Sequence, residues 1–236
     1  MQVTWLIARN SCELNISGRT IIMNHNCCCL LPGQVCSATL QTPAKGNHVA
    51  VIAESPTEAA ADLDMPLVGK TGVNVCRLFE LLKEREPARY KQFCLRRALI
   101  LNASPKKVDG KLEPNGDYGF NLMKDYLRKV EIVICVGERA LNVYSELKGE
   151  LLKIPETEIE LCHLGARGLA RLSKWHPKDD GTKKPIAVPE RTKMELIAEW
   201  VDNCCKGKGS YSIRQFEAYY SKRIEEVIKM SRSCRR

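Results

Sequence analysis

Apolar residues in the middle of the chain form short continuous runs that alternate with segments where apolar residues recur every three or four positions. The continuous runs span residues 49–53, 98–101, 132–136 and 159–162. Such runs are typical of strands buried on both faces, and the spaced segments are typical of amphipathic helices. We therefore expect an α/β fold of three layers, α/β/α, with a central four-stranded parallel sheet.

The segments between and after these runs predict helices. The first covers residues 73–84, the second passes through Met123 and Leu127, the third follows Gly137, and the last follows Pro189. We assign residues 46–205 to this α/β domain. Residues 1–45 lack a clear period and carry clusters of Asn, Cys, Gly and Pro, so we expect an irregular lead-in.

The end of the chain predicts a basic helical extension over residues 206–236. Residues 206–211 read as a Gly/Lys/Ser linker. Ser212 and Gln215 then have the spacing of a capping box, which marks the start of a helix. We expect this helix to pack on the domain with its basic residues in solvent; contact with nucleic acid is the alternative.

The net charge of +9 favours a polyanionic partner, of which nucleic acid is the commonest. No apolar run reaches the roughly 20 residues that a membrane span needs, and no signal peptide is recognisable. We therefore expect a cytoplasmic monomer, with its twelve cysteines reduced. The cysteines at 27–29 and Cys36 could suggest a metal site, but their spacing fits no standard ligand pair.

One polar feature follows each predicted strand. Glu54 follows the first strand, Asn102 the second, Gly137 the third and His163 the fourth. The carboxyl ends of parallel strands meet at one edge of a sheet, where ligands bind in α/β proteins. We therefore expect these residues to share one site.

These features resemble the uracil-DNA glycosylase superfamily, most closely its family 4, over residues 49–203. Residues 53–57 read Ala-Glu-Ser-Pro-Thr where the family carries Gly-Glu-x-Pro-Gly. Residues 64–72 read Asp-Met-Pro-Leu-Val-Gly-Lys-Thr-Gly where it carries Gly-x-Pro-Phe-Val-Gly-x-x-Gly. A strand that ends in Asn, a Gly-x-x-Ala sequence at 137–140, and a histidine at the place of a His-Pro-Ser motif complete the match.

The resemblance implies a DNA glycosylase that flips a base out of DNA and hydrolyses its N-glycosidic bond, leaving an abasic site. The breaking bond develops positive charge on the sugar and negative charge on the base. A carboxylate stabilises the first and activates water, and a histidine donates to the second, so Glu54 and His163 are the catalytic candidates. Asn102 can read the flipped base through its amide, with Ser55 and Leu67 beside it. The candidates for contact with the DNA backbone are Gly69, Lys70, Thr71, Gly165 and Arg167.

The departures from the family suggest a changed base pocket. Leu67 replaces a phenylalanine that stacks on uracil, Thr57 replaces a glycine, and Leu164-Gly165 replaces Pro-Ser. A larger pocket favours a modified base over uracil, such as a modified cytosine of phage DNA, and would suit antiviral defence in a bacterial or phage context. The family's four cluster cysteines are not matched, so we expect no cofactor.

Two other functions remain open at this point. The chain could be a non-catalytic DNA-binding relative that keeps the fold and its basic surface. It could also be an unrelated Rossmann-like enzyme that acts on nucleotides, although neither a Gly-x-Gly-x-x-Gly fingerprint nor a P-loop follows a predicted strand.

Overall fold

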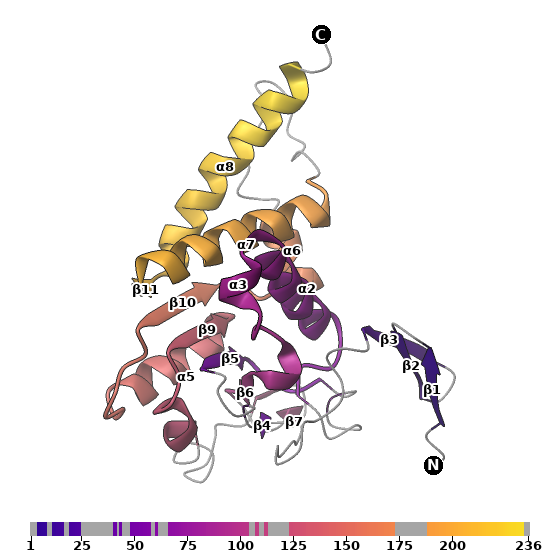
Figure 1. Ribbon diagram of the computed structural model, residues 1–236, viewed down its shortest axis with the longest axis vertical. Helices are drawn as coiled ribbons and strands as arrows, with labels where there is room; N and C mark the ends of the chain where they lie inside the picture. Colours follow the sequence, from indigo (N-terminus) through magenta and orange to yellow (C-terminus); the bar gives the residue numbers. More distant parts are fainter. Residues whose placement is uncertain are drawn as a thin grey trace.

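The structure is a computed structural model (Figure 1). It describes residues 4–8, 11–16, 19–24, 40–41, 43, 48–57, 60, 66–103, 107–108, 111–112, 123–172 and 188–233. The cysteines at 27–29 and Cys36 lie outside these ranges, as does the segment 61–65. Among the described helices, none is both long and apolar enough to cross a membrane.

A six-stranded sheet forms the centre of the described chain. Its order is β11 (Gly209–Tyr211), β10 (Thr157–Leu161), β9 (Ile132–Val136), β5 (Val49–Ala53), β6 (Leu99–Asn102) and β4 (Leu40–Gln41). The first five of these strands are parallel, and β4 runs antiparallel to β6. The α/β class and the four apolar strands are thus as expected, all four parallel and adjacent.

The expected number of four strands was wrong, because β4 and β11 extend the sheet at its two edges. Residues Gly209–Tyr211 were interpreted as part of a linker, but they pair with β10 in the register Thr157↔Gly209. The backbone N–H of Gly209 also donates to the carbonyl of Glu156, 2.7 Å away. Strands of two or three residues carry too little pattern to be recognised before their partner is known.

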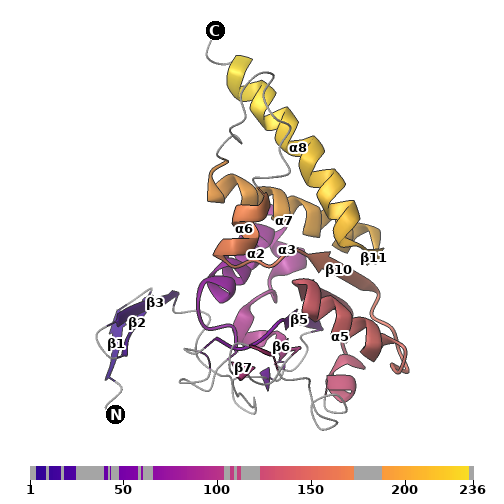
Figure 2. The ribbon, with the colours of Figure 1, turned by 180° about the vertical axis from the view of Figure 1, so that it is seen from behind.

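Helices cover both faces of the sheet, because alternate residues of each strand point to opposite sides. Val49 and Val51 belong to one apolar core, and Ala50 and Ile52 belong to the other. The first core is covered by α2 (Lys70–Arg85), α7 (Glu190–Gly207) and α8 (Ile213–Ser233), and the second by α5 (Glu138–Lys148) and a helical turn at 123–127 (Figures 1 and 2). The shorter elements are α3 (Pro87–Tyr90), η2 (Leu95–Arg97), α6 (Ala166–Leu172), β7 (Lys107–Val108) and β8 (Lys111–Leu112).

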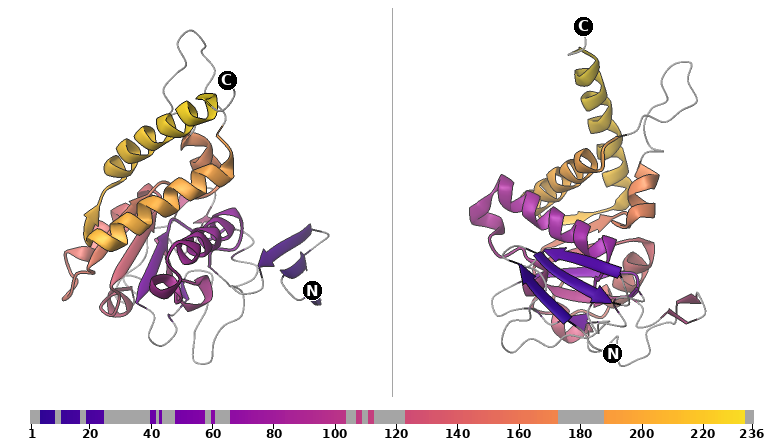
Figure 3. Two further views of the ribbon diagram at one scale, coloured as in Figure 1. Left: turned by 45° about the horizontal axis from the view of Figure 1, so that its top comes forward. Right: turned by 90° about the vertical axis from the view of Figure 1, so that its right-hand side faces the viewer.

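The C-terminal helix α8 packs on the main domain beside α7 (Figure 3). Phe216, Tyr220 and Ile224 are fully buried in the first core. The expected capping box is confirmed: the Ser212 N–H donates to Gln215 Oε1 at 2.7 Å, and the Gln215 N–H donates to Ser212 Oγ at 3.3 Å. The segment 206–236 is therefore tied to the domain by both β11 and α8.

The N-terminal segment differs from the expected irregular lead-in. Strands β1 (Thr4–Ala8), β2 (Ser11–Ile16) and β3 (Arg19–Asn24) form an antiparallel three-stranded sheet. The two connections are two residues long, Arg9-Asn10 and Ser17-Gly18. Two-residue connections containing Asn or Gly are typical of β-hairpins, and this was the signal that could have identified them.

Candidate active site at the carboxyl edge of the sheet

The strand order changes the direction of the chain connections between β5 and β9. The chain passes from β5 to β6 on one side, while β9 lies on the other side of β5. Connections that leave two neighbouring strands in opposite directions open a space between them, and ligands of α/β proteins bind at this point. Glu54 directly follows β5, and Gly137 directly follows β9.

Glu54 lies against the backbone of Gly137. A Cβ atom added to Gly137 would lie 2.3 Å from Glu54 Oε1, well inside van der Waals contact. Gly137 also has a φ of +99°, which side chains disfavour. Only glycine satisfies both conditions, so the absence of a side chain after β9 leaves room for the Glu54 carboxylate.

His163 faces Glu54 from the loop after β10. Its Nε2 atom lies 3.9 Å from Glu54 Oε2. The two side chains are 39% and 29% exposed, respectively, so both can be reached by a ligand. The structure thus brings together the two residues that the sequence analysis named as catalytic.

A backbone hydrogen bond selects the tautomer of the neutral His163 ring. The N–H of Gly165 donates to His163 Nδ1 at 2.9 Å. Because Nδ1 accepts this bond, the neutral ring carries its proton on Nε2, the nitrogen that faces Glu54. In this tautomer, His163 presents an N–H donor towards the Glu54 carboxylate.

Gly165 also holds the His163 loop close to the start of α2. A Cβ atom added there would lie 2.6 Å from His163 Cε1 and 3.2 Å from Thr71 Oγ1. Asn74, buried in α2, donates its side-chain N–H to the carbonyl of Leu164 at 2.6 Å. Gly165 and Thr71, both expected near the DNA backbone, thus lie close to His163.

The loop that precedes α2 has an unusual backbone. Leu67 has a φ of +57° and Gly69 a φ of +114°. A Cβ atom added to Gly72 would lie 1.6 Å from the Leu67 carbonyl oxygen, so the loop folds tightly back over the first turn of the helix. Leu67 is half-buried and packs against the first core.

Thr57 and Asn74 were not expected to organise the site. The Thr57 hydroxyl donates to the Val68 carbonyl at 2.9 Å and accepts from the N–H of Ala60 at 3.1 Å. Thr57 thereby joins the motif at 53–57 to the glycine loop. The only sequence signal for Asn74 was a polar residue within the apolar face of a helix.

Two of the expected ligand-contacting residues are engaged within the protein. Lys70 Nζ lies 2.6 Å from Glu190 Oε1, and both side chains are about half exposed. Asn102 ends β6 beside Ala53 but is only 1% exposed. Ser55 is half-buried next to Glu54, and Arg167 is exposed in α6.

Comparison of the chain with models of known protein families and with curated protein sequences finds no match. The resemblance to uracil-DNA glycosylases therefore rests on the motifs of the chain alone.

Cys162, next to His163, does not form a Cys–His nucleophile. Burial raises the pKa of its thiol to about 12, so the sulfur stays protonated at neutral pH. The described side chains at this edge that could take part in a reaction thus include the Glu54 carboxylate and the Nε2–H donor of His163. Together they can stabilise a cation on one part of a ligand and developing negative charge on another.

Proposed function

We propose that this protein is a DNA glycosylase that uses water to release a base and leave an abasic site. The observation that carries the proposal is the pairing of Glu54 with the N–H donor of His163, 3.9 Å apart at the carboxyl edge of the sheet. When the bond between sugar and base breaks, the sugar becomes a cation and the base an anion. A carboxylate can stabilise the cation, and an N–H donor can stabilise the anion.

Glu54 acts on the sugar side of this bond. As the bond between C1′ and the base nitrogen breaks, its electron pair leaves with the base and positive charge develops at the sugar. The Glu54 carboxylate stabilises that charge and accepts a proton from the water that attacks C1′. The glycine at position 137 supports this role, because it leaves room for the carboxylate at the end of β9.

His163 acts on the base side. Its Nε2–H donates to an oxygen of the departing base, where negative charge accumulates. The Nε2–H stabilises the developing anion as a hydrogen-bond donor and keeps its proton as the base departs. The hydrogen bond from the Gly165 N–H keeps the ring in this tautomer.

A modified base is favoured over plain uracil. Leu67 stands where the resembled family has an aromatic ring, so the pocket has no flat wall at this position. The hydroxyl of Thr57 is also turned to the Val68 carbonyl, which removes it from base recognition. We propose a modified cytosine, as found in phage DNA, as the substrate class, with uracil as the alternative.

DNA fits the charge of the protein. The chain carries a net charge of +9, and Arg167 lies exposed within four residues of His163. Lys70 is held by Glu190 in a surface ion pair, which contributes little stability, so a DNA phosphate can compete for it.

A panel of duplex oligonucleotides tests the proposal. Each duplex carries one uracil, cytosine, hydroxymethylcytosine or glucosylated hydroxymethylcytosine, and abasic sites are scored as strand breaks after alkali treatment. We expect breaks at a modified cytosine and fewer or none at unmodified cytosine. Tight binding of the same duplexes without any abasic sites would instead identify a non-catalytic DNA-binding relative.

A further inference from the structure

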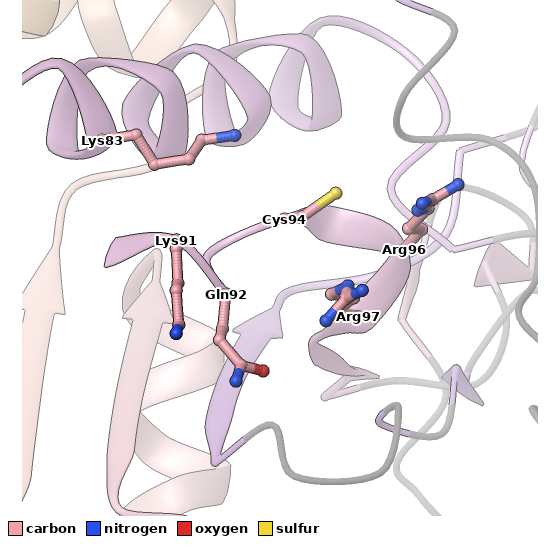
Figure 4. Close-up of a pocket in the computed structure, with 6 residues that line it drawn as sticks. All are labelled: Lys83, Lys91, Gln92, Cys94, Arg96 and Arg97. Carbon is pink, nitrogen blue, oxygen red and sulfur yellow. The ribbon is translucent and has the colours of Figure 1, made fainter. Parts of the chain in front are cut away.

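A polar pocket lies at the amino edge of the sheet, opposite the candidate active site. It occupies about 410 Å³ between the end of α2, α3 and η2, a size within the usual range for small-ligand sites. Because η2 leads directly into β6, the pocket lies at the amino end of that strand. Its lining side chains are Lys83, Lys91, Gln92, Cys94, Arg96 and Arg97 (Figure 4).

Four of these six side chains are cations. None of the four forms an ion pair with any residue that the structure describes. The acids on neighbouring turns are already paired, since Glu80 and Glu84 contact Arg77, and Glu86 contacts Arg89. Positive charge is therefore concentrated around one cavity without a compensating acid from the described chain.

The backbone that carries these cations is held in place. The buried side chain of Gln41 donates to the carbonyls of Leu95 and Ala98, at 2.6 Å and 3.1 Å. Phe93 packs edge-on against the ring of Tyr90, with ring centroids 4.9 Å apart. The turn is thus organised before any ligand binds, which lowers the entropy lost on binding.

The lining favours phosphate groups over bases or apolar ligands. None of the six side chains is aromatic, so the pocket offers no surface for stacking a base. Arg96 and Arg97 provide planar donors that match phosphate oxygens in pairs, and Lys83 and Lys91 add point charges. Four cations exceed what one phosphate of charge about −2 would balance.

We propose that this pocket binds a compact polyphosphate, such as the linked phosphates of a nucleoside triphosphate. The site is separate from the candidate active site, because α2, 16 residues and about 24 Å long, leads from the Lys70 end of the sheet to the pocket. It is independent of the glycosylase proposal, since it requires no base excision.

Titration calorimetry with tripolyphosphate, at low salt and on the full chain, tests the site. We expect one molecule bound per chain, and inorganic phosphate bound at least about tenfold more weakly. The double variant R96A/R97A should weaken tripolyphosphate binding by about tenfold or more. R214A removes an exposed arginine in α8 and should leave the affinity unchanged.

Two results would overturn the proposal. The first is no binding of tripolyphosphate at millimolar concentration, whether or not duplex DNA binding depends on Arg96 and Arg97. The second is an equal loss of tripolyphosphate affinity in R96A/R97A and R214A. If R96A/R97A has a lower thermal unfolding midpoint than the parent protein, the variant K83A/K91A is measured in its place. Both lysines line the pocket and are at least partly exposed to solvent, so their loss should disturb the fold less. Unchanged tripolyphosphate affinity in that variant would count equally against the site.

Discussion

At the carboxyl edge of the sheet, Glu54 Oε2 and His163 Nε2 lie 3.9 Å apart. Gly137 lies beside Glu54, and Gly165 lies beside His163. At the amino edge, four cations surround a cavity of about 410 Å³ with no described acid paired to them. The first arrangement places a hydrogen-bond acceptor, the carboxylate, close to a hydrogen-bond donor, the imidazole N–H. A methyl group added at Gly137 or Gly165 would disturb their positions. The second arrangement attracts an anion through the summed positive charge of its four cations.

This difference separates a site suited to reaction from a site suited to binding. A carboxylate beside a neutral N–H donor can stabilise both halves of a bond that breaks into ions. A cluster of cations has no proton acceptor and can only hold an anion. Substitutions at the carboxyl edge should therefore leave tripolyphosphate binding unchanged, and substitutions at the amino edge should leave base excision unchanged.

The largest effect is expected for Glu54→Gln, which keeps the shape of the side chain and removes its charge. Excision should fall by about 10³-fold or more, because the sugar cation and the attacking water lose their carboxylate. Single-turnover formation of abasic sites measures the loss. DNA binding and tripolyphosphate binding should stay as in the parent protein.

Glu146→Gln is the matched control, since Glu146 is an exposed acid of α5. Its excision rate should equal that of the parent protein. Equal rates for the parent protein and Glu54→Gln would remove Glu54 from the reaction.

Gly165→Ala should reduce excision by about 10²-fold, the loss expected when one donor to developing charge is misplaced. The added methyl group would lie 2.6 Å from His163 Cε1, so the ring must turn away from Glu54. Single-turnover kinetics with the substrate identified from the oligonucleotide panel provide the readout.

Gly149→Ala is the control for the glycine change. A methyl group there meets only the Glu146 carbonyl, at 3.7 Å, and φ is −61°, a conformation that alanine adopts freely. Similar excision rates for Gly165→Ala and Gly149→Ala would show that the position of His163 is not critical.

Asp202→Asn tests the framework of the amino edge. The buried Asp202 carboxylate accepts hydrogen bonds from Tyr90 at 2.7 Å and from Lys206 at 2.8 Å. Loss of the charge should lower the free energy of unfolding at pH 7 by about 2 kcal/mol, as for other buried bonds to charged groups. Urea denaturation measures this, and the excision rate should change little.

The same variant predicts a pH dependence. Burial alone would raise the pKa of Asp202, but the hydrogen bonds from Lys206 and Tyr90 outweigh it, and the pKa lies below its ordinary value. The stabilisation is therefore full above the unfolded pKa of about 3.9 and is lost as the pH falls through the lower folded value. In that acidic range, the free energy of unfolding of Asp202→Asn should approach that of the parent protein.

Glu195→Gln is the control for this stability measurement, because it breaks the surface pair with Arg191 and should change the unfolding free energy by less than about 1 kcal/mol. A deficit in Asp202→Asn that stays constant as the pH falls well below the unfolded pKa would contradict the assigned role of the charge.

The smallest effect is expected for Leu67→Phe, which adds a ring beside the proposed base pocket. The ratio of excision rates should shift by about tenfold from the larger base towards uracil, since pocket volume discriminates weakly. Leu152→Phe, at a side chain that is 88% exposed, is the control. A shift towards the larger base would contradict the assignment of Leu67 to the pocket wall.

The carboxyl edge could largely be predicted from the sequence. Continuous apolar runs identified β5, β6, β9 and β10, and the rule that parallel strands end at one edge brought Glu54 and His163 together. The tautomer of His163 could not be predicted, because it depends on a backbone N–H of Gly165 whose direction only the folded loop defines.

The amino edge could not be predicted in the same way. The four cations lie near the end of α2, directly after α3 and in η2, and in the sequence each is an ordinary cation: Lys83, Lys91, Arg96 and Arg97. Their convergence depends on how α2 packs beside the turn held by Gln41. The strands β4 and β11 were missed for a similar reason, since their pairing is long-range and their length is two or three residues.

We propose that the carboxyl edge releases an intact base by hydrolysis. Mass spectrometry of the small-molecule products after incubation with phage DNA rich in modified cytosine tests this proposal. We expect free modified base in solution, one abasic site for each base released, and no release by Glu54→Gln. Release of nucleosides or nucleotides, or of no product from any of the tested DNAs, would contradict it.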